Sequence, residues 1–448
     1  MLLHSITPRE RGRSLTTTSS QPRACRIITS MPPTPTPASI LSFEQARHLV
    51  EEHAGALRPQ GKELVALLDS AGQILAEPML ADRNFPPFPR ASRDGYALRA
   101  ADLAKLPATL KVITEIKAGA TADASLKIES GQAAAIMTGA PAPPGCDAVV
   151  MVEYTLRDGD QITITKGVAA GDNIVPVAAE AKRGDRLLSP GMRLDHAAIA
   201  VAASVGRSRL LVYSKPRVAV LATGDELVDI DVPLALNQIR NSNTHSLAAQ
   251  IQAAGGEPML LPIAPDEPER LQELIADGFE ADLLLLSGGV SMGKYDLVEQ
   301  VLAQFEAEFF FTGVQIQPGR PVVFGRIPCG AVDPAGHKYF FGLPGNPVST
   351  MVTFELFVRP VLEALAGMLP RKLVFLRAKL KSEIKTKQGL KRFLPATLSG
   401  EFEQAEVELM RWQGSGDIAA TAKANCYIVI PPDRERIASG EWVPILMR

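Results

Sequence analysis

Cysteine and histidine are scarce in this sequence, and neither forms a metal-binding motif. The four cysteines form no C-x-x-C pair: Cys25, Cys146, Cys329 and Cys426. This excludes a zinc ribbon, and such spacing is typical of a reducing compartment, so we expect a cytoplasmic protein. The six histidines include no H-E-x-x-H. A metal site would therefore use the abundant carboxylates and hold a hard cation, most simply Mg²⁺.

The net charge is also small, Trp and Tyr are few, and long apolar runs are absent from the sequence. The formal net charge is −2, and only two Trp and six Tyr occur. A near-neutral chain without stacking residues is not expected to bind nucleic acid or an acidic membrane surface. No apolar run reaches the ~18 residues of a membrane span. At ~100–200 residues per domain, 448 residues predict three or four domains.

The N-terminal segment, residues 1–38, differs from the rest. It is rich in Arg, Ser, Thr and Pro, and Glu10 is its only acid. Without an apolar core it is not a secretory signal. We expect a disordered tail. One alternative is an organelle transit peptide. Another is that the true initiator is Met31, so that the residues before it are not translated.

The next part of the chain changes from helical to β-rich. Ser42 and Gln45 have the spacing of a capping box, which predicts a helix start. Residues 107–170 read as strands, with a hairpin turn at 157–160. Three prolines make residues 85–98 stiff and extended, so this segment cannot be a central strand. It presents Asp94 on a turn, which is by itself an ordinary Asp-Gly turn.

The stretch ADLLLLSGGVSMGKYD, residues 281–296, organises the second half of the chain. Its four leucines predict a short strand buried on both faces, as in a parallel sheet. Gly288 and Gly289 let the backbone turn and leave N–H groups that, before a helix, favour an anion. The plainer alternative is a tight strand–helix turn capped by Asp296. If the loop instead binds an anion, the carboxylate of Asp296 implies a cation that bridges it to the anion.

From residue 217 the chain alternates between strands and helices, which predicts a doubly wound α/β unit. Ligands of such sheets lie beyond the carboxyl ends of the strands. Three loops hold that position, TGDEL, SGGVSMGKYD and LPGNPVS, and three such loops on one edge favour a site over three structural turns. After Pro370 the pattern is β-rich again and predicts a small barrel or sandwich.

Eight motifs occur in order along the chain: SRDGYA, IMTGAPAPPGCDAVV, TGDEL, IRNSN, SGGVSMGKYD, PGRP, FGLPGNPVS and QGSGD. From about Leu41 to Arg448 the chain thus resembles the molybdopterin molybdenumtransferases, which include the C-terminal domain of gephyrin. The resemblance implies a multidomain α/β plus β fold and a homodimer. Its expected parts are a tail (1–38), an elongated linker domain (39–81 and 182–214), an inserted β-rich domain (82–181), a doubly wound α/β domain (215–370) and a C-terminal small β-barrel (371–448).

The family's reaction takes adenylylated molybdopterin and molybdate, with Mg²⁺, and releases AMP as molybdenum cofactor forms. In the dimer the cleft lies between the α/β domain of one subunit and the inserted domain of the other. The resemblance implies catalytic roles for Asp94, Glu226 and Asp296. Asp225, Glu226 and Asp296 are the expected Mg²⁺ ligands, directly or through water. The expected substrate-binding residues are Thr138, Gly288, Gly289, Ser291, Arg320, Pro344, Pro347, Ser349 and Ser415.

Four departures from the family pattern fall at positions that are usually charged, although Glu180 changes only the length of the side chain. Glu180 stands where relatives often have Asp, and Asn241 replaces an aspartate of some members. Gln317 stands where a lysine is common, and Pro395 where many have an arginine, for which Arg392 is a possible substitute. With the carboxylates intact and positive charge removed near molybdate, we expect an active enzyme with weak molybdate affinity.

Two rival functions remain at this stage. The related molybdopterin adenylyltransferase shares the α/β domain, but Gly-Gly-Thr-Gly would be expected after the leucine strand, where this chain has Gly-Gly-Val-Ser. A contact between this chain and such an adenylyltransferase is a possible partnership. The second rival is a non-catalytic dimeric carrier or scaffold on the same fold, against which the retained Asp94, Glu226 and Asp296 argue.

Overall fold

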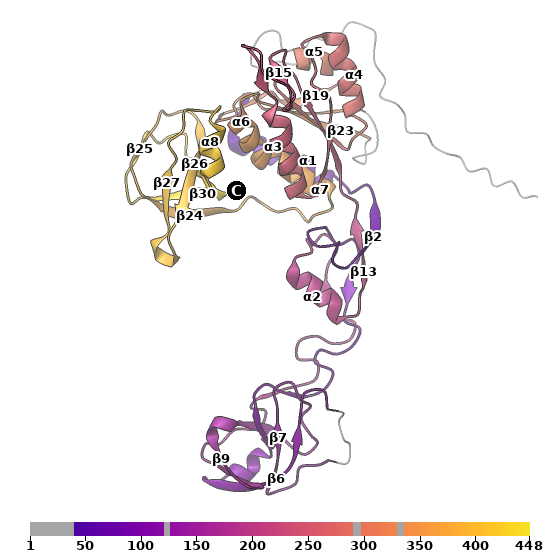
Figure 1. Cartoon of the computed structure of the whole chain (residues 1–448), viewed down its shortest axis with the longest axis vertical. Helices are drawn as coiled ribbons and strands as arrows, with labels where there is room; N and C mark the ends of the chain where they lie inside the picture. The colour runs from indigo at the N-terminus through magenta and orange to yellow at the C-terminus, as the bar shows by residue number, and fades with distance from the viewer. Residues whose placement is uncertain (1–39, 121–125, 290–296, 329–335) are drawn as a thin grey trace, which may run out of the picture. The chain divides into compact units, whose positions relative to one another are not determined.

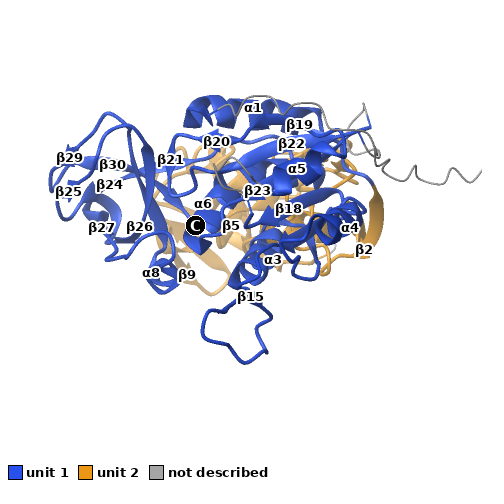
Figure 2. Cartoon of the chain, turned by 90° about the horizontal axis from the view of Figure 1, so that it is seen from above, with its two compact units in different colours: residues 1–60, 214–448 blue, residues 61–213 orange. Residues whose placement is uncertain are grey.

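The computed structural model describes residues 40–120, 126–289, 297–328 and 336–448. Two compact units divide the chain: unit 1 comprises residues 1–60 and 214–448, and unit 2 comprises residues 61–213 (Figure 2). Within the described ranges, every helix is too short or too polar to cross a membrane.

Unit 1 is built on a six-stranded sheet in the order β17-β14-β18-β23-β22-β19. The first four strands are parallel and the last two are antiparallel additions at one edge. The strands are β14 (Arg217–Ala222), β17 (Glu257–Leu260), β18 (Leu283–Ser287), β19 (Glu308–Phe311), β22 (Val323–Ile327) and β23 (Lys338–Leu343). The alternating pattern did not anticipate β19 and β22, because no helix separates them.

Helices cover both faces of this sheet (Figure 1). Leu283 and Leu285 of β18 pack with α1, α3, α6 and α7, whereas Leu284 and Leu286 pack with α4 and α5. The predicted doubly wound arrangement is therefore confirmed. The helices are α1 (Phe43–Ala56), α3 (Ser242–Ala254), α4 (Pro268–Gly278), α5 (Leu297–Ala303), α6 (Pro347–Thr353) and α7 (Arg359–Leu365).

Local sequence signals set the helix ends. The predicted capping box opens α1: the backbone N–H of Gln45 donates to Ser42 Oγ at 3.2 Å, and that of Ser42 donates to Gln45 Oε1 at 3.0 Å. Gly255 ends α3 with a φ of 97°, a left-handed conformation that glycine adopts without strain.

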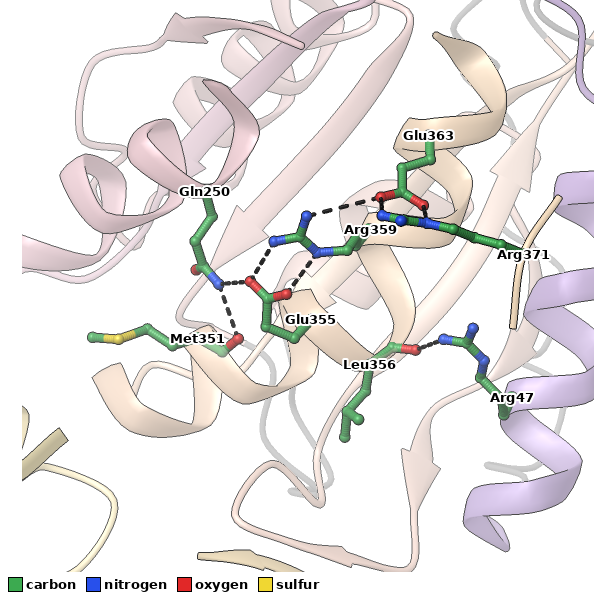
Figure 3. Close-up of polar contacts among 8 residues, drawn as sticks. All are labelled: Arg47, Gln250, Met351, Glu355, Leu356, Arg359, Glu363 and Arg371. Atoms are coloured by element: carbon green, nitrogen blue, oxygen red, sulfur yellow. Dashed lines mark hydrogen bonds and ion pairs between the residues drawn. The ribbon is translucent and has the colours of Figure 1, made fainter. Parts of the chain in front are cut away.

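A π-helical segment, η3 (Phe354–Val358), joins α6 to α7. Pro360 lies four residues after Leu356 and has no N–H for the Leu356 carbonyl. The Arg47 guanidinium of α1 donates to that carbonyl instead (Figure 3). Beside it, Glu355 accepts from Arg359 Nε at 2.6 Å and from Gln250 Nε2 at 2.7 Å. These contacts fix the helices behind α6, whose N-terminus reaches the candidate site.

The C-terminal part of unit 1 is a closed five-stranded barrel, which decides between the two predicted architectures. The order β26-β27-β24-β30-β28 closes through a pairing of β28 with β26. These strands are β24 (Phe375–Leu380), β26 (Lys391–Ser399), β27 (Glu406–Leu409), β28 (Cys426–Ile430) and β30 (Trp442–Met447), with α8 (Ile418–Lys423) beside them. A two-residue strand from the α/β part, β21 (Ile316–Gln317), pairs in parallel with β26.

Unit 2 contains a six-stranded sheet in the order β8-β5-β7-β6-β10-β9. Its strands are β5 (Gly95–Leu98), β6 (Ala108–Ile116), β7 (Gln132–Ile136), β8 (Ala148–Met151), β9 (Thr155–Asp158) and β10 (Gln161–Ile164). The predicted hairpin joins β9 and β10. Further along, β2 (Lys62–Ala66) pairs with β13 (Arg209–Tyr213), β3 (Met79–Leu80) pairs with β12 (Arg186–Leu188), and α2 (His196–Ser204) lies between β12 and β13 in the sequence. The proposed domain boundaries stay a prediction.

One sequence-based expectation for unit 2 is wrong. Gly95–Leu98 is a fully buried strand between β7 and β8, although the segment 85–98 was not expected to supply a central strand. The prolines that motivated the expectation all precede it and leave its N–H groups available. Gly95 permits a close approach to β8, because a Cβ there would lie 1.9 Å from the Val150 carbonyl oxygen.

Candidate functional site

A cleft of about 970 Å³ lies at the carboxyl ends of β14, β18 and β23 in unit 1. Its walls come from the loops after these strands, the IRNSN segment and the barrel loop near Gly416. Five predicted site residues line it: Glu226, Gly288, Gly289, Pro344 and Pro347. The structure thus brings together loops that the sequence placed on one edge of the sheet.

The glycine pair after β18 makes a sharp turn against the end of β14. Gly288 has a φ of 90° and Gly289 a φ of 63°, both in the left-handed region. A Cβ on Gly288 would lie 2.6 Å from the Thr223 carbonyl oxygen. The Gly288 N–H donates to the Leu343 carbonyl at 3.2 Å, so it is not free for a phosphate as the sequence suggested.

Acidic side chains gather at one side of this cleft. Glu226 and Asp266 line it, and Asp225 Oδ1 accepts from the Asp266 N–H at 3.1 Å. Burial raises the pKa of the Asp266 carboxyl, and the charges of Asp225 and Glu226 raise it further. Sequence reasoning missed Asp266, although it follows β17 and therefore belongs to the same edge. Among the described residues, no three His, Cys, Asp or Glu side chains are grouped to hold a metal ion.

Asn243, at the start of α3, links three parts of the cleft and was also missed. Its Nδ2 group donates to Ser287 Oγ at 2.9 Å and to the Gly345 carbonyl at 2.7 Å. Its Oδ1 is buried and has no partner among the described residues, as is true of Thr223 Oγ1. Buried polar atoms are normally paired, so these two are exceptions among the described residues around the cleft.

Replacing Asn243 by Ala is expected to separate the loops after β18 and β23. Losing the hydrogen bond to the buried Ser287 hydroxyl lowers the free energy of unfolding by about 1–3 kcal/mol, and we expect substrate binding to weaken as well. Urea titration of the purified chain measures the first effect. Ser242→Ala, an exposed neighbour in the same cleft, is the control. Equal losses in both variants would contradict this role of Asn243.

A second cleft, of about 510 Å³, lies between the α/β part and the barrel of unit 1. It shares Pro321 and Asn346 with the first cleft. Three of the expected substrate-binding residues line it, namely Arg320, Ser349 and Ser415. The Ser415 carbonyl accepts from the Val348 N–H at 3.0 Å, which holds the barrel loop against α6.

Asp94 and Thr138 belong to unit 2 and lie together at neighbouring strand ends. Asp94 directly precedes β5 and Thr138 follows β7, its antiparallel neighbour. Asp94 Oδ1 accepts from the Thr138 N–H at 2.6 Å and from Thr138 Oγ1 at 2.9 Å. These two donors, the backbone N–H first, lower the pKa of the exposed Asp94 carboxyl. Asp94 is therefore an ionised carboxylate at neutral pH.

Two predicted site residues, Ser291 and Asp296, lie outside the described residues. Glu180, considered as a substitute for the usual aspartate, pairs with Arg90 at 2.6 Å in unit 2. Whether it replaces that aspartate in function stays a prediction.

Family models account for most of the chain. Residues 41–206 match the MoeA N-terminal region (domain I and II), residues 219–364 match a probable molybdopterin binding domain, and residues 377–447 match the MoeA C-terminal region (domain IV).

Curated relatives and a solved structure agree with these matches. A molybdopterin molybdenumtransferase from Nostoc sp. is 35% identical over 86% of this chain and 89% of its own length. One from Haemophilus influenzae is 33% identical over 91% of this chain and 98% of its own length. The crystal structure of a molybdopterin biosynthesis moeA protein from Pyrococcus horikoshii OT3 has a TM-score of 0.73 at 28% identity, covering 92% of this chain and 100% of that one. The chain therefore belongs to the molybdopterin molybdenumtransferase family, and is a transferase of molybdenum cofactor biosynthesis.

Proposed function

We propose that the chain inserts molybdenum from molybdate into adenylylated molybdopterin, with Mg²⁺, and releases AMP as molybdenum cofactor forms. The observation that carries this proposal is the pair of adjoining clefts in unit 1. The first is large and has acidic side chains in its lining, and the second is lined with cations. A bulky pterin nucleotide suits the first cleft, and a small dianion suits the second.

The donor chemistry of the first cleft fits a hard cation. Asp225 and Glu226 are close enough for their charges to raise the pKa of Asp266, and no described Arg or Lys side chain forms an ion pair with any of the three. Asp225, Glu226 and Asp296 would hold Mg²⁺, directly or through water. When bound, the ion would neutralise the phosphates of the nucleotide.

We propose that the Asp94 of one subunit acts at the cleft of its partner subunit, where it orients water or transfers a proton as an oxo ligand leaves. Asp94 lies in unit 2, whereas the acidic and cationic clefts lie in unit 1. We propose a homodimer in which unit 2 of one copy completes the cleft of the other. The lowered pKa of the Asp94 carboxyl favours a role as a hydrogen-bond acceptor that orients water. It disfavours a role as a proton donor at neutral pH.

The test uses purified full chain with adenylylated molybdopterin, Mg²⁺ and molybdate, and follows AMP release. The proposal expects AMP only after molybdate is added, together with active cofactor, and loss of both after chelation of Mg²⁺. Bound adenylate that is never released at any molybdate concentration would contradict insertion and favour a carrier or scaffold. Half-saturation by molybdate in the low micromolar range would contradict the weak affinity expected from the sequence.

A further inference from the structure

The second cleft contains a buried cation, Arg392, which the sequence offered only as a possible substitute for the arginine usual at position 395. Arg392, the second residue of β26, lines this cleft and is only 7% exposed. Its register partner on β21 is Gln317, whose Oε1 accepts from Arg392 Nε at 2.8 Å. Arg392 Nη1 donates to the Leu390 carbonyl at 3.1 Å. The guanidinium is thus held in one orientation by neutral groups.

The charges around Arg392 leave its positive charge uncompensated. No Asp or Glu is among the described residues that line this cleft, and the cations Arg320 and Lys387 line it as well. Among the described residues, Arg392 has no carboxylate partner. Burial is the one cause that lowers its pKa, with no opposing charge to raise it, yet an arginine stays protonated. A buried, unpaired guanidinium is costly in isolation, and a bound anion would offset that cost.

The adjacent residue shows that this arrangement is particular to Arg392. Lys391 carries the same charge one position earlier, but its ammonium group pairs with Glu44 and lies 4.8 Å from the ring centroid of Phe43. The two neighbours on β26 therefore differ. The charge of Lys391 is compensated by Glu44 on α1, whereas Arg392 lines the cleft. The neutral Gln317 is consistent with this, because a lysine there would repel the guanidinium.

We propose that Arg392, positioned by Gln317, is a principal oxyanion-binding residue of the second cleft and binds the substrate molybdate. In this chain, Arg392 supplies positive charge that is lost at positions 317 and 395. The identity of the oxyanion rests on the proposed function, whereas the geometry of Arg392 and Gln317 does not.

The test measures binding of molybdate to the full chain by equilibrium dialysis, without the nucleotide substrate. Removing a charge-assisted hydrogen-bond donor in Arg392→Gln is expected to raise the molybdate Kd by about 10- to 100-fold. Gln317→Glu has nearly the same shape and is expected to raise the Kd similarly, because the new carboxylate pairs with Arg392 and competes with the anion. Lys391→Gln removes the same charge from the adjacent residue and should change the Kd by less than about twofold.

The fluorescence of Trp412 gives an independent measurement of molybdate binding, because this residue lines the same cleft and the only other tryptophan is Trp442. In a Trp442→Phe background, a change in Trp412 fluorescence on molybdate addition should follow the same order of variants. A wild-type chain that binds no molybdate would overturn the proposal. So would wild-type Kd values in both Arg392→Gln and Gln317→Glu.

Failure of this inference can be distinguished from failure of the proposed function. If AMP release depends on molybdate but the Arg392 and Gln317 variants bind molybdate as the wild type does, insertion stands and the inference fails. If the variants lose molybdate binding but the wild type never releases AMP, the inference stands as an oxyanion site and insertion fails.

Discussion

The Asp94→Asn protein is expected to fold and to bind substrate, while its rate of cofactor formation falls by about 10²- to 10⁴-fold. The amide keeps the shape of the carboxyl and can still accept from Thr138, but it has no negative charge with which to orient water. Molybdate-dependent AMP release measures the rate, and light scattering checks that the proposed dimer persists. Asp94→Ala should keep the dimer as well and lose turnover.

The pH dependence of the reaction rate tests whether the negative charge of Asp94, and not only the shape of its side chain, is needed for activity. Two hydrogen bonds, the one from the Thr138 backbone N–H first, lower the pKa of Asp94, so it takes up its proton at a lower pH than an ordinary aspartate does. Thr138→Val removes the side-chain donor at 2.9 Å and keeps the backbone donor at 2.6 Å. The acidic limb of the rate profile should therefore move to higher pH in this variant, but only in part, because the backbone N–H is the larger cause.

Two results would contradict the role of Asp94. An Asp94→Asn protein with more than about one tenth of wild-type activity would leave no need for a carboxylate at this position. An acidic limb that is unchanged in Thr138→Val would assign that limb to another group.

The parts of the fold that sequence predicted best are those where one residue pattern has one physical solution. Leu283 to Leu286 are buried alternately in two cores, and only a strand covered on both faces satisfies four consecutive leucines followed by a glycine pair. The capping box at Ser42 and the glycine after α3 are likewise local signals with local causes. The family resemblance, carried by motifs over most of the chain, supplied the reaction class.

The parts that sequence did not predict depend on contacts between distant segments. Arg392 and Gln317 are 75 residues apart and meet because a two-residue strand joins the barrel, and so short a strand has no periodic signal. The bond from the Gly288 N–H to Leu343 arises because β18 and β23 are neighbours, which residue spacing alone does not determine. Asp266 lies in no recognised motif, and only the order of the strands places it beside Asp225.

A methyl group at Gly288 is expected to have the second large effect. In Gly288→Ala the new Cβ would lie 2.6 Å from the Thr223 carbonyl oxygen, at a φ of 90° that alanine adopts with strain. The contact is with backbone, so the ends of β14 and β18 must separate. We expect the free energy of unfolding to fall by about 2–4 kcal/mol through strain and overpacking, and AMP release to fall at least 100-fold because the cleft is built on this turn. Urea titration and the AMP assay measure the two effects.

The control for Gly288→Ala is a glycine of the same cleft without a crowded Cβ position. At Gly345 a Cβ would meet only the Gly288 Cα, at an ordinary 3.6 Å, and this glycine does not have a positive φ. Gly345→Ala therefore adds the same methyl group to the cleft and should cost less than about 1 kcal/mol of stability. If both variants unfold at the same urea concentration as the wild type, the close approach at Thr223 does not constrain the turn. If Gly288→Ala loses activity but not stability, the turn itself is tolerant and the methyl group acts by occupying substrate space.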